Sequence, residues 1–121
     1  MTHKLFLFIM FLGVFSNVYT QNDAYYLKQA ERYQNEAAYY SKQAETHTGD
    51  ATYYSKQAES YLNDAEYYTS RGDFGKAKTR QGWATDALSK AKIRTGWATD
   101  ALKKAATRTQ WAVESLKKAG K

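Results

Sequence analysis

The chain has 121 residues, of which 43% are hydrophobic, and it contains neither cysteine nor proline. This size allows one small domain, the lack of proline favours helices, and the lack of cysteine excludes disulfides and thiolate metal sites. The formal net charge of +6 conceals two halves of opposite sign, because residues 21–70 carry a net charge of −4 and residues 71–121 a net charge of +9. Such halves are expected to attract each other.

Residues 1–20 have the features of a secretory signal peptide. Lys4 supplies a positive start, residues 5–15 are an apolar run, and a polar stretch with cleavage positions after Ser16 or Thr20 follows. The apolar run is shorter than the ~20 residues that cross a bilayer. The mature chain is therefore expected outside the cell without stable membrane insertion, where a nucleic-acid partner is not expected.

Residues 21–70 repeat a seven-residue pattern. Alanines recur every seven residues, and aromatic residues fall between them. In the combined series the distance from one residue to the next alternates between three and four positions. The alanines are Ala30, Ala37, Ala44, Ala51, Ala58 and Ala65, and the residues between them include Tyr33, Tyr40, His47, Tyr54 and Tyr61. This is the a/d stripe of a coiled coil, and it predicts an acidic Tyr/Ala helix over residues 21–70.

The stripe is interrupted at residues 71–75, where two glycines predict a chain reversal. The reversal contains Arg71-Gly72-Asp73. This tripeptide resembles the integrin-recognition motif of adhesion proteins, which implies that Arg71, Gly72 and Asp73 attach the chain to an integrin-like receptor. The alternative is structural, because Gly-Asp is favourable in turns and Asp73 would cap the following helix.

Residues 76–121 follow a second pattern with the same period. Alanines again recur every seven residues, from Ala77 to Ala119, and Trp83, Trp97 and Trp111 each precede one of them. The pattern predicts a basic Trp/Ala helix. In both halves glycines fall at solvent-side positions, namely Gly49, Gly82 and Gly96, where they are expected to weaken the helices without ending them.

These elements predict an all-α fold, a long antiparallel helical hairpin with an alanine seam. If the turn centres between Gly72 and Asp73, the numbers of facing residues sum to 145. Large residues then face small ones, as interdigitation requires, with Tyr61 opposite Ala84. Arginines of the second helix, Arg80, Arg94 and Arg108, are expected to stack on tyrosines of the first. The tryptophans beside the seam are expected to carry much of the apolar burial.

A row of tyrosines points away from the predicted seam. Tyr25, Tyr39, Tyr53 and Tyr67 recur every 14 residues, which corresponds to ~21 Å along a helix. Exposed aromatic rows indicate a partner, and self-association is the simplest one. We therefore expect these tyrosines, together with Trp83, Trp97 and Trp111, to mediate it.

Catalysis finds no support in the sequence. His3 lies in the leader and His47 in the seam, and no Ser/His/Asp set, HExxH motif or phosphate-binding glycine loop is present. No catalytic residue, cofactor or dedicated metal site is predicted. Weak calcium or mineral contact through Glu31, Glu45, Glu59 and Asp64 stays open.

The alanines every seven residues, the Tyr-Tyr and GWATDAL repeats and the leader resemble secreted repetitive structural proteins of invertebrates, such as shell-matrix proteins, cements and coiled-coil silks. The resemblance implies a non-enzymatic extracellular protein that self-assembles and contacts a matrix polymer or mineral. Unlike silks the chain is short, and unlike many mineral-matrix proteins it is basic. Two alternatives are a cationic membrane-active peptide in the second half and a cell-attachment module. The abundance of tyrosine also suggests crosslinking in place of disulfides.

Overall fold

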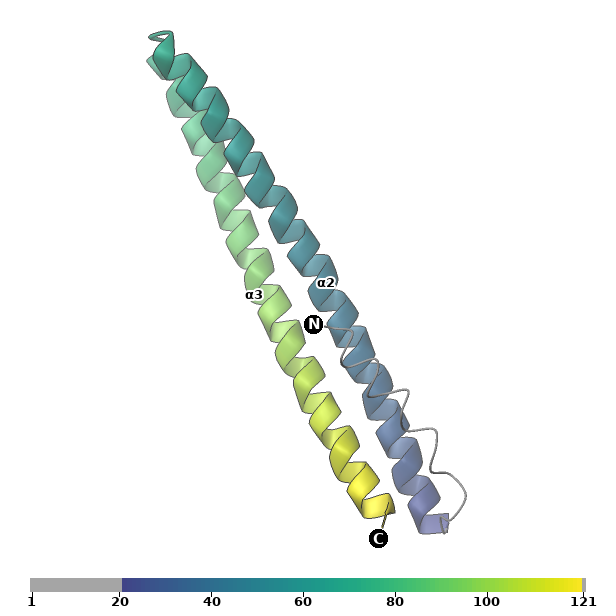
Figure 1. The fold of residues 1–121 in the computed structure, drawn as a ribbon. Coiled ribbons are helices and arrows are strands. Elements are labelled where there is room, and N and C mark those ends of the chain that lie inside the picture. Colours follow the sequence, from purple (N-terminus) through teal and green to yellow (C-terminus); the bar gives the residue numbers. More distant parts are fainter. Residues whose placement is uncertain (1–20, 121) are drawn as a thin grey trace. The chain divides into compact units, whose positions relative to one another are not determined.

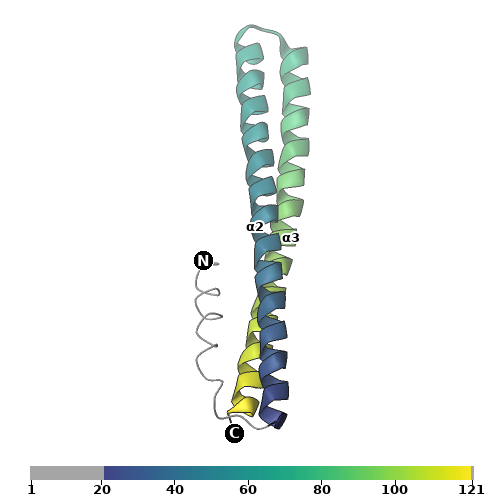
Figure 2. The same cartoon turned by 90° about the vertical axis from the view of Figure 1, so that its right-hand side faces the viewer.

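The computed structural model describes residues 21–120, so the predicted leader lies outside the described residues. The described chain contains helix α2, Gln21–Ser70, and helix α3, Phe74–Ala119. The two helices pack antiparallel as a hairpin and are joined by a short turn (Figures 1 and 2). The predicted fold class is confirmed.

The chain divides into two compact units. Residues Glu45–Thr99 form the turn unit, which contains the reversal and the adjoining parts of both helices. The terminal unit consists of the described residues up to Ala44 together with those from Asp100 onward. In each unit a segment of α2 packs against a segment of α3.

Alanines make up the buried seam between the helices. Among the described residues every buried hydrophobic residue is an alanine, with at most 8% of its surface exposed. In α2 these are Ala30, Ala37, Ala44, Ala51, Ala58 and Ala65, and in α3 they are Ala77, Ala84, Ala87, Ala91, Ala98, Ala101, Ala105, Ala112 and Ala119. Because alanine ends at Cβ, a seam of this composition allows two helix backbones to approach closely.

The packing of the turn unit confirms the register predicted for it. Ala58, Ala84 and Ala87 form one buried cluster, and Tyr61 packs against it. These are the residues that the pairing rule places together, Tyr61 with Ala84 and Ala58 with Ala87. The tyrosines between the alanines are half-buried, so their rings close the sides of the seam.

The reversal is a helix C-cap followed directly by an N-cap. The Gly72 N–H donates to the Thr69 carbonyl at 3.0 Å, and the Asp73 N–H donates to the Tyr68 carbonyl at 2.9 Å. These two bonds define a Schellman motif, and they require the left-handed backbone that Gly72 adopts at φ 79°. The Asp73 carboxylate then accepts the Lys76 N–H at 3.3 Å and caps α3. The predicted chain reversal is thus formed at Gly72.

The remaining interior glycines do not interrupt the helices. α2 is continuous through Gly49, and α3 is continuous through Gly82 and Gly96. A Cβ added at any of the three would meet no neighbouring atom within 4 Å, so all three face open space. This agrees with the predicted solvent-side positions.

Candidate functional site

The polar contacts between the helices are organised around arginines of α3. In the turn unit Arg94 Nη1 donates to Asp50 Oδ2 of α2 at 3.2 Å. The same guanidinium lies 4.7 Å from the ring centroid of Trp97 and 5.7 Å from that of Tyr54. One arginine therefore contacts a carboxylate and two aromatic rings at once, a combination that its planar, delocalised charge permits.

This cluster occurs three times, once every 14 residues. Arg80 contacts Asp64 at 3.9 Å and lies over the rings of Trp83 and Tyr68 at 4.3 and 5.7 Å. In the terminal unit Arg108 donates to Glu36 at 2.6 Å and lies over the rings of Trp111 and Tyr40 at 4.6 and 5.5 Å. The predicted stacking of the arginines on tyrosines is confirmed in all three clusters.

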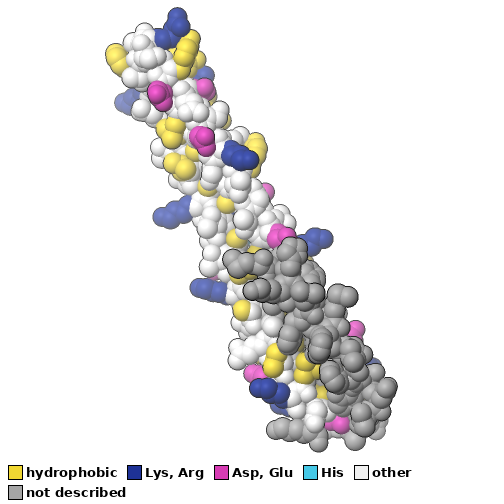
Figure 3. All heavy atoms as spheres, viewed as in Figure 1, with side chains coloured by type: hydrophobic (Ala, Val, Ile, Leu, Met, Phe, Trp, Pro, Cys, Tyr) yellow, Lys and Arg dark blue, Asp and Glu magenta, His cyan; other side chains and the backbone are white. Residues whose placement is uncertain are grey.

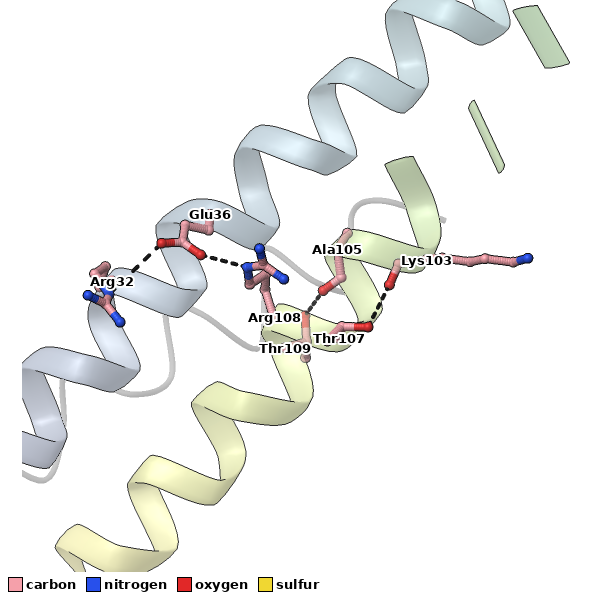
Figure 4. A network of polar contacts seen from close by, with 7 residues as sticks. All are labelled: Arg32, Glu36, Lys103, Ala105, Thr107, Arg108 and Thr109. Atoms are coloured by element: carbon pink, nitrogen blue, oxygen red, sulfur yellow. Dashed lines mark hydrogen bonds and ion pairs between the residues drawn. The ribbon is translucent and has the colours of Figure 1, made fainter. Parts of the chain in front are cut away.

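Figure 4 shows the contacts of Glu36 in the terminal unit. Arg108 reaches its carboxylate from α3, and Arg32 reaches it from the preceding turn of α2 at 3.9 Å. The carboxylate thus lies between two guanidinium groups. Since the side chains of Glu36 and Arg108 are 39% and 23% exposed, solvent weakens this pair only in part.

The tryptophans of α3 pack against aromatic residues of α2. Trp83, Trp97 and Trp111 pack edge-to-face against Tyr61, His47 and Tyr33, with ring centroids 5.4–5.5 Å apart. Their exposed fractions are nevertheless 44%, 47% and 40%. More than half of the surface of each tryptophan is therefore buried, although none of the three is fully enclosed. Their share of the apolar burial stays a prediction.

The predicted outward tyrosines are exposed and held in place. Tyr25, Tyr39, Tyr53 and Tyr67 have exposed fractions of 53–59%. Their hydroxyls accept bonds of 2.8–2.9 Å from the residue four positions later, namely Gln29, Gln43, Gln57 and Arg71. Each ring also contacts the following tyrosine edge-to-face. These rings are therefore exposed but restricted in their rotamers.

Hydrophobic side chains do not merge into one apolar surface on the face seen in Figure 3, where they form small groups with charged side chains between them. Besides the tyrosines and tryptophans, the exposed large hydrophobic residues of the described chain are Leu62, Phe74, Leu88, Ile93 and Leu102. No helix among the described residues is long and apolar enough to cross a membrane.

The tripeptide Arg71-Gly72-Asp73 lies at the reversal. The Arg71 side chain folds back onto α2, where it donates to the Tyr67 hydroxyl at 2.9 Å and lies 5.3 Å from that ring centroid. The Asp73 carboxylate caps α3 and pairs with Lys76 at 3.7 Å. Both charged groups of the tripeptide are thus engaged within the turn unit.

Candidate metal and catalytic groups are not brought together. The described residues contain no group of three or more histidine, aspartate or glutamate side chains that could hold a metal ion. Asp64, one of the residues considered for weak calcium contact, instead pairs with Arg80. His47 packs against Trp97 within the turn unit.

The carboxylates that bind the arginines are the site residues that sequence analysis missed. Glu36, Asp50 and Asp64 are spaced 14 residues apart, as are Arg80, Arg94 and Arg108. The shared period is the signal for these pairs, because two series with the same step pair throughout an antiparallel hairpin once one pair is in register.

Comparison with known proteins finds no relatives. No family model matches the chain, and no curated protein and no solved structure is significantly similar to it.

Proposed function

We propose that the chain is a secreted, non-enzymatic structural protein of an extracellular matrix, and that it self-associates through its outward tyrosines. The observation that carries the proposal is the row formed by Tyr25, Tyr39, Tyr53 and Tyr67. Each ring is more than half exposed, yet each is fixed by a hydrogen bond and a ring contact. Rings restricted in advance lose little side-chain entropy on association, which favours their use in a contact.

The regular spacing suits association between copies of one chain. Identical tyrosines in α2 recur at ~21 Å, so a row on one copy matches a row on another in several registers. Tyrosine supplies a large apolar area together with a hydroxyl, a combination enriched at protein interfaces. The leader in residues 1–20 supports secretion, and the alanine seam needs no disulfide to hold it together.

Sedimentation velocity of the mature chain over a range of concentrations tests this function. We expect concentration-dependent assembly, and replacement of all four outward tyrosines by serine should weaken it by at least roughly tenfold. A matched control replaces four other exposed apolar residues by serine: Leu62, Leu88, Ile93 and Leu102. Assembly that is unchanged in the tyrosine variant, or lost equally in the control, would contradict the proposal.

Cell attachment through Arg71, Gly72 and Asp73 is a second candidate, favoured by the position of the tripeptide at the exposed reversal. Receptor binding would require Arg71 to leave Tyr67. We therefore expect Tyr67→Phe, which removes the hydroxyl acceptor, to strengthen attachment of cells to the immobilised chain, and Arg71→Gln to abolish it. Equal attachment to all three proteins would exclude this candidate.

A further inference from the structure

Each unit contains an open pocket beside one of the tryptophans. The pocket of the turn unit has a volume of about 320 Å³ and is lined by Gln57, Tyr61, Trp83, Asp86, Ala87 and Lys90. The pocket of the terminal unit has a volume of about 250 Å³ and is lined by Tyr33, Trp111, Glu114, Ser115 and Lys118. Neither pocket is lined by a tyrosine of the outward row, although Gln57 of the first pocket donates to the Tyr53 hydroxyl.

The two pockets have the same chemical construction. Each combines a tryptophan and a tyrosine with one carboxylate, one lysine and one small residue, and corresponding residues lie 28 positions apart along the chain. The carboxylate, the small residue and the lysine follow the tryptophan by three, four and seven positions in both cases. A constellation that recurs in two units is a regular feature of this chain rather than an accident of one surface.

Each pocket is lined by a tryptophan that also contacts an arginine. Arg80 lies 4.3 Å from the centroid of Trp83 and precedes it by almost one helical turn, while the pocket residues Asp86 and Lys90 follow it. Arg108 lies over Trp111 in the same way, at 4.6 Å. Despite these contacts Trp83 and Trp111 keep exposed fractions of 44% and 40%, and each lines its pocket. A ligand with an apolar face can therefore contact the exposed part of the indole.

The rim of the pocket offers hydrogen-bond donors and acceptors, and the charges of its carboxylate and its ammonium group cancel. Asp86 supplies a carboxylate, and Lys90 supplies an ammonium group that is held 5.6 Å from the Tyr54 ring. Gln57 donates to the Tyr53 hydroxyl at 2.9 Å, which leaves its amide oxygen as an acceptor at the rim. In the terminal unit Lys118 lies 5.6 Å from the Tyr26 ring and faces the pocket with Glu114.

We propose that the two pockets bind hexopyranose units of a neutral, β-linked polysaccharide. Such a sugar has an apolar face of C–H groups that can stack on an indole, and equatorial hydroxyls that both donate and accept hydrogen bonds at its edge. An anionic ligand would meet the carboxylate, and a purely apolar ligand would desolvate two charged groups without replacing their hydrogen bonds. The two sites have the same construction, so each should bind the same sugar.

Titration of the full mature chain with soluble oligomers of β-1,4-linked N-acetylglucosamine and of β-1,4-linked glucose tests the proposal. Indole fluorescence and the indole N–H signals in NMR report the contact, and isothermal calorimetry reports the number of sites. We expect two sites, with Trp83→Leu and Trp111→Leu each removing one and the double variant removing both. Asp86→Ala should weaken the remaining site of Trp111→Leu at least roughly threefold, because one acceptor is lost.

Leu88→Ala and Leu102→Ala are matched controls, since both residues are exposed and neither lines a pocket. Circular dichroism must show that every variant keeps its helices. Lack of binding to both neutral oligomers, or binding that survives the double tryptophan variant, overturns the proposal. Binding to heparin oligosaccharides alone, lost at high salt, also overturns it and points to the basic charge of α3. Oligomer binding and sedimentation are separate measurements, so this inference and self-association can fail independently.

Discussion

Single residues decide the geometry of the reversal in this molecule. Gly72 occupies a left-handed conformation that side chains with a Cβ rarely adopt, and two hydrogen bonds of the C-cap depend on it. Gly82, in contrast, has ordinary helical geometry and faces open space. The same residue type thus has opposite consequences at the two positions: Gly72 lies in the interruption between the two repeats, and Gly82 belongs to the GWATDAL repeat.

Alanine substitutions separate these two roles. Gly72→Ala is expected to lower the free energy of unfolding by about 1 kcal/mol, because the left-handed backbone becomes strained. Gly82→Ala should raise it by about 0.5–1 kcal/mol, because it restricts the unfolded chain and meets no neighbouring atom. Urea unfolding followed by circular dichroism at 222 nm measures both. Equal effects of the same sign would show that the cap at Gly72 does not form as described.

The helices are held together by a seam whose residues are unusually small. Most of the stability of a helix in a protein comes from burial of one face. Here that face consists of alanines, and half-buried tyrosines close it at the sides. Each alanine contributes little apolar area. The stability of the seam therefore depends on the close approach of the two helix backbones rather than on large side chains. A seam of this kind tolerates enlargement poorly.

Enlarging the seam provides a test at the level of the helices. Ala84, which is 1% exposed and contacts Ala58 and Tyr61, should not accommodate leucine, and Ala84→Leu is expected to destabilise the hairpin by about 1–3 kcal/mol. Ser89→Leu is the control in the same helix and unit, because Ser89 is exposed, and its effect should stay within about 0.5 kcal/mol. Thermal unfolding at matched concentration measures both variants. A stabilising effect of Ala84→Leu would mean that the seam is looser than the structure indicates.

Electrostatics acts on the whole molecule through the three arginine clusters. Each cluster joins the acidic helix α2 to the basic helix α3 at a step of 14 residues, so the opposite charges of the two halves meet at defined points rather than as a diffuse attraction. The side chains of the pairs are 23–51% exposed, so each salt bridge contributes modestly and its ring contacts add to it.

Replacing Arg80, Arg94 and Arg108 together by glutamine tests this contribution. We expect the free energy of unfolding to fall by about 2–3 kcal/mol, which is the sum of three partly exposed pairs and their ring contacts. The control replaces the exposed lysines Lys78, Lys92 and Lys103 by glutamine, which changes the net charge equally. If both triple variants unfold at the same urea concentration, net charge matters and the clusters do not.

The sequence by itself determined the elements and their pairing in the turn unit. The seven-residue alanine pattern, its interruption at residues 71–75 and the opposite charges of the two halves are local or additive properties, and a helical hairpin follows from them. The outward position of Tyr25, Tyr39, Tyr53 and Tyr67 could also be predicted, because a heptad assigns each residue to a side of its helix.

Only the tertiary structure decided which charged side chains pair across the seam and how much of each side chain stays in solvent. The exposure of Trp83, the pairing of Asp50 with Arg94 and the recurring pockets depend on the distance and rotation between two helices. A periodic pattern specifies only the direction in which a side chain points from the axis of its own helix. It does not specify the distance or the rotation between the two helices. The small volume of alanine, which sets how closely two backbones can approach, is the physical reason that these contacts form.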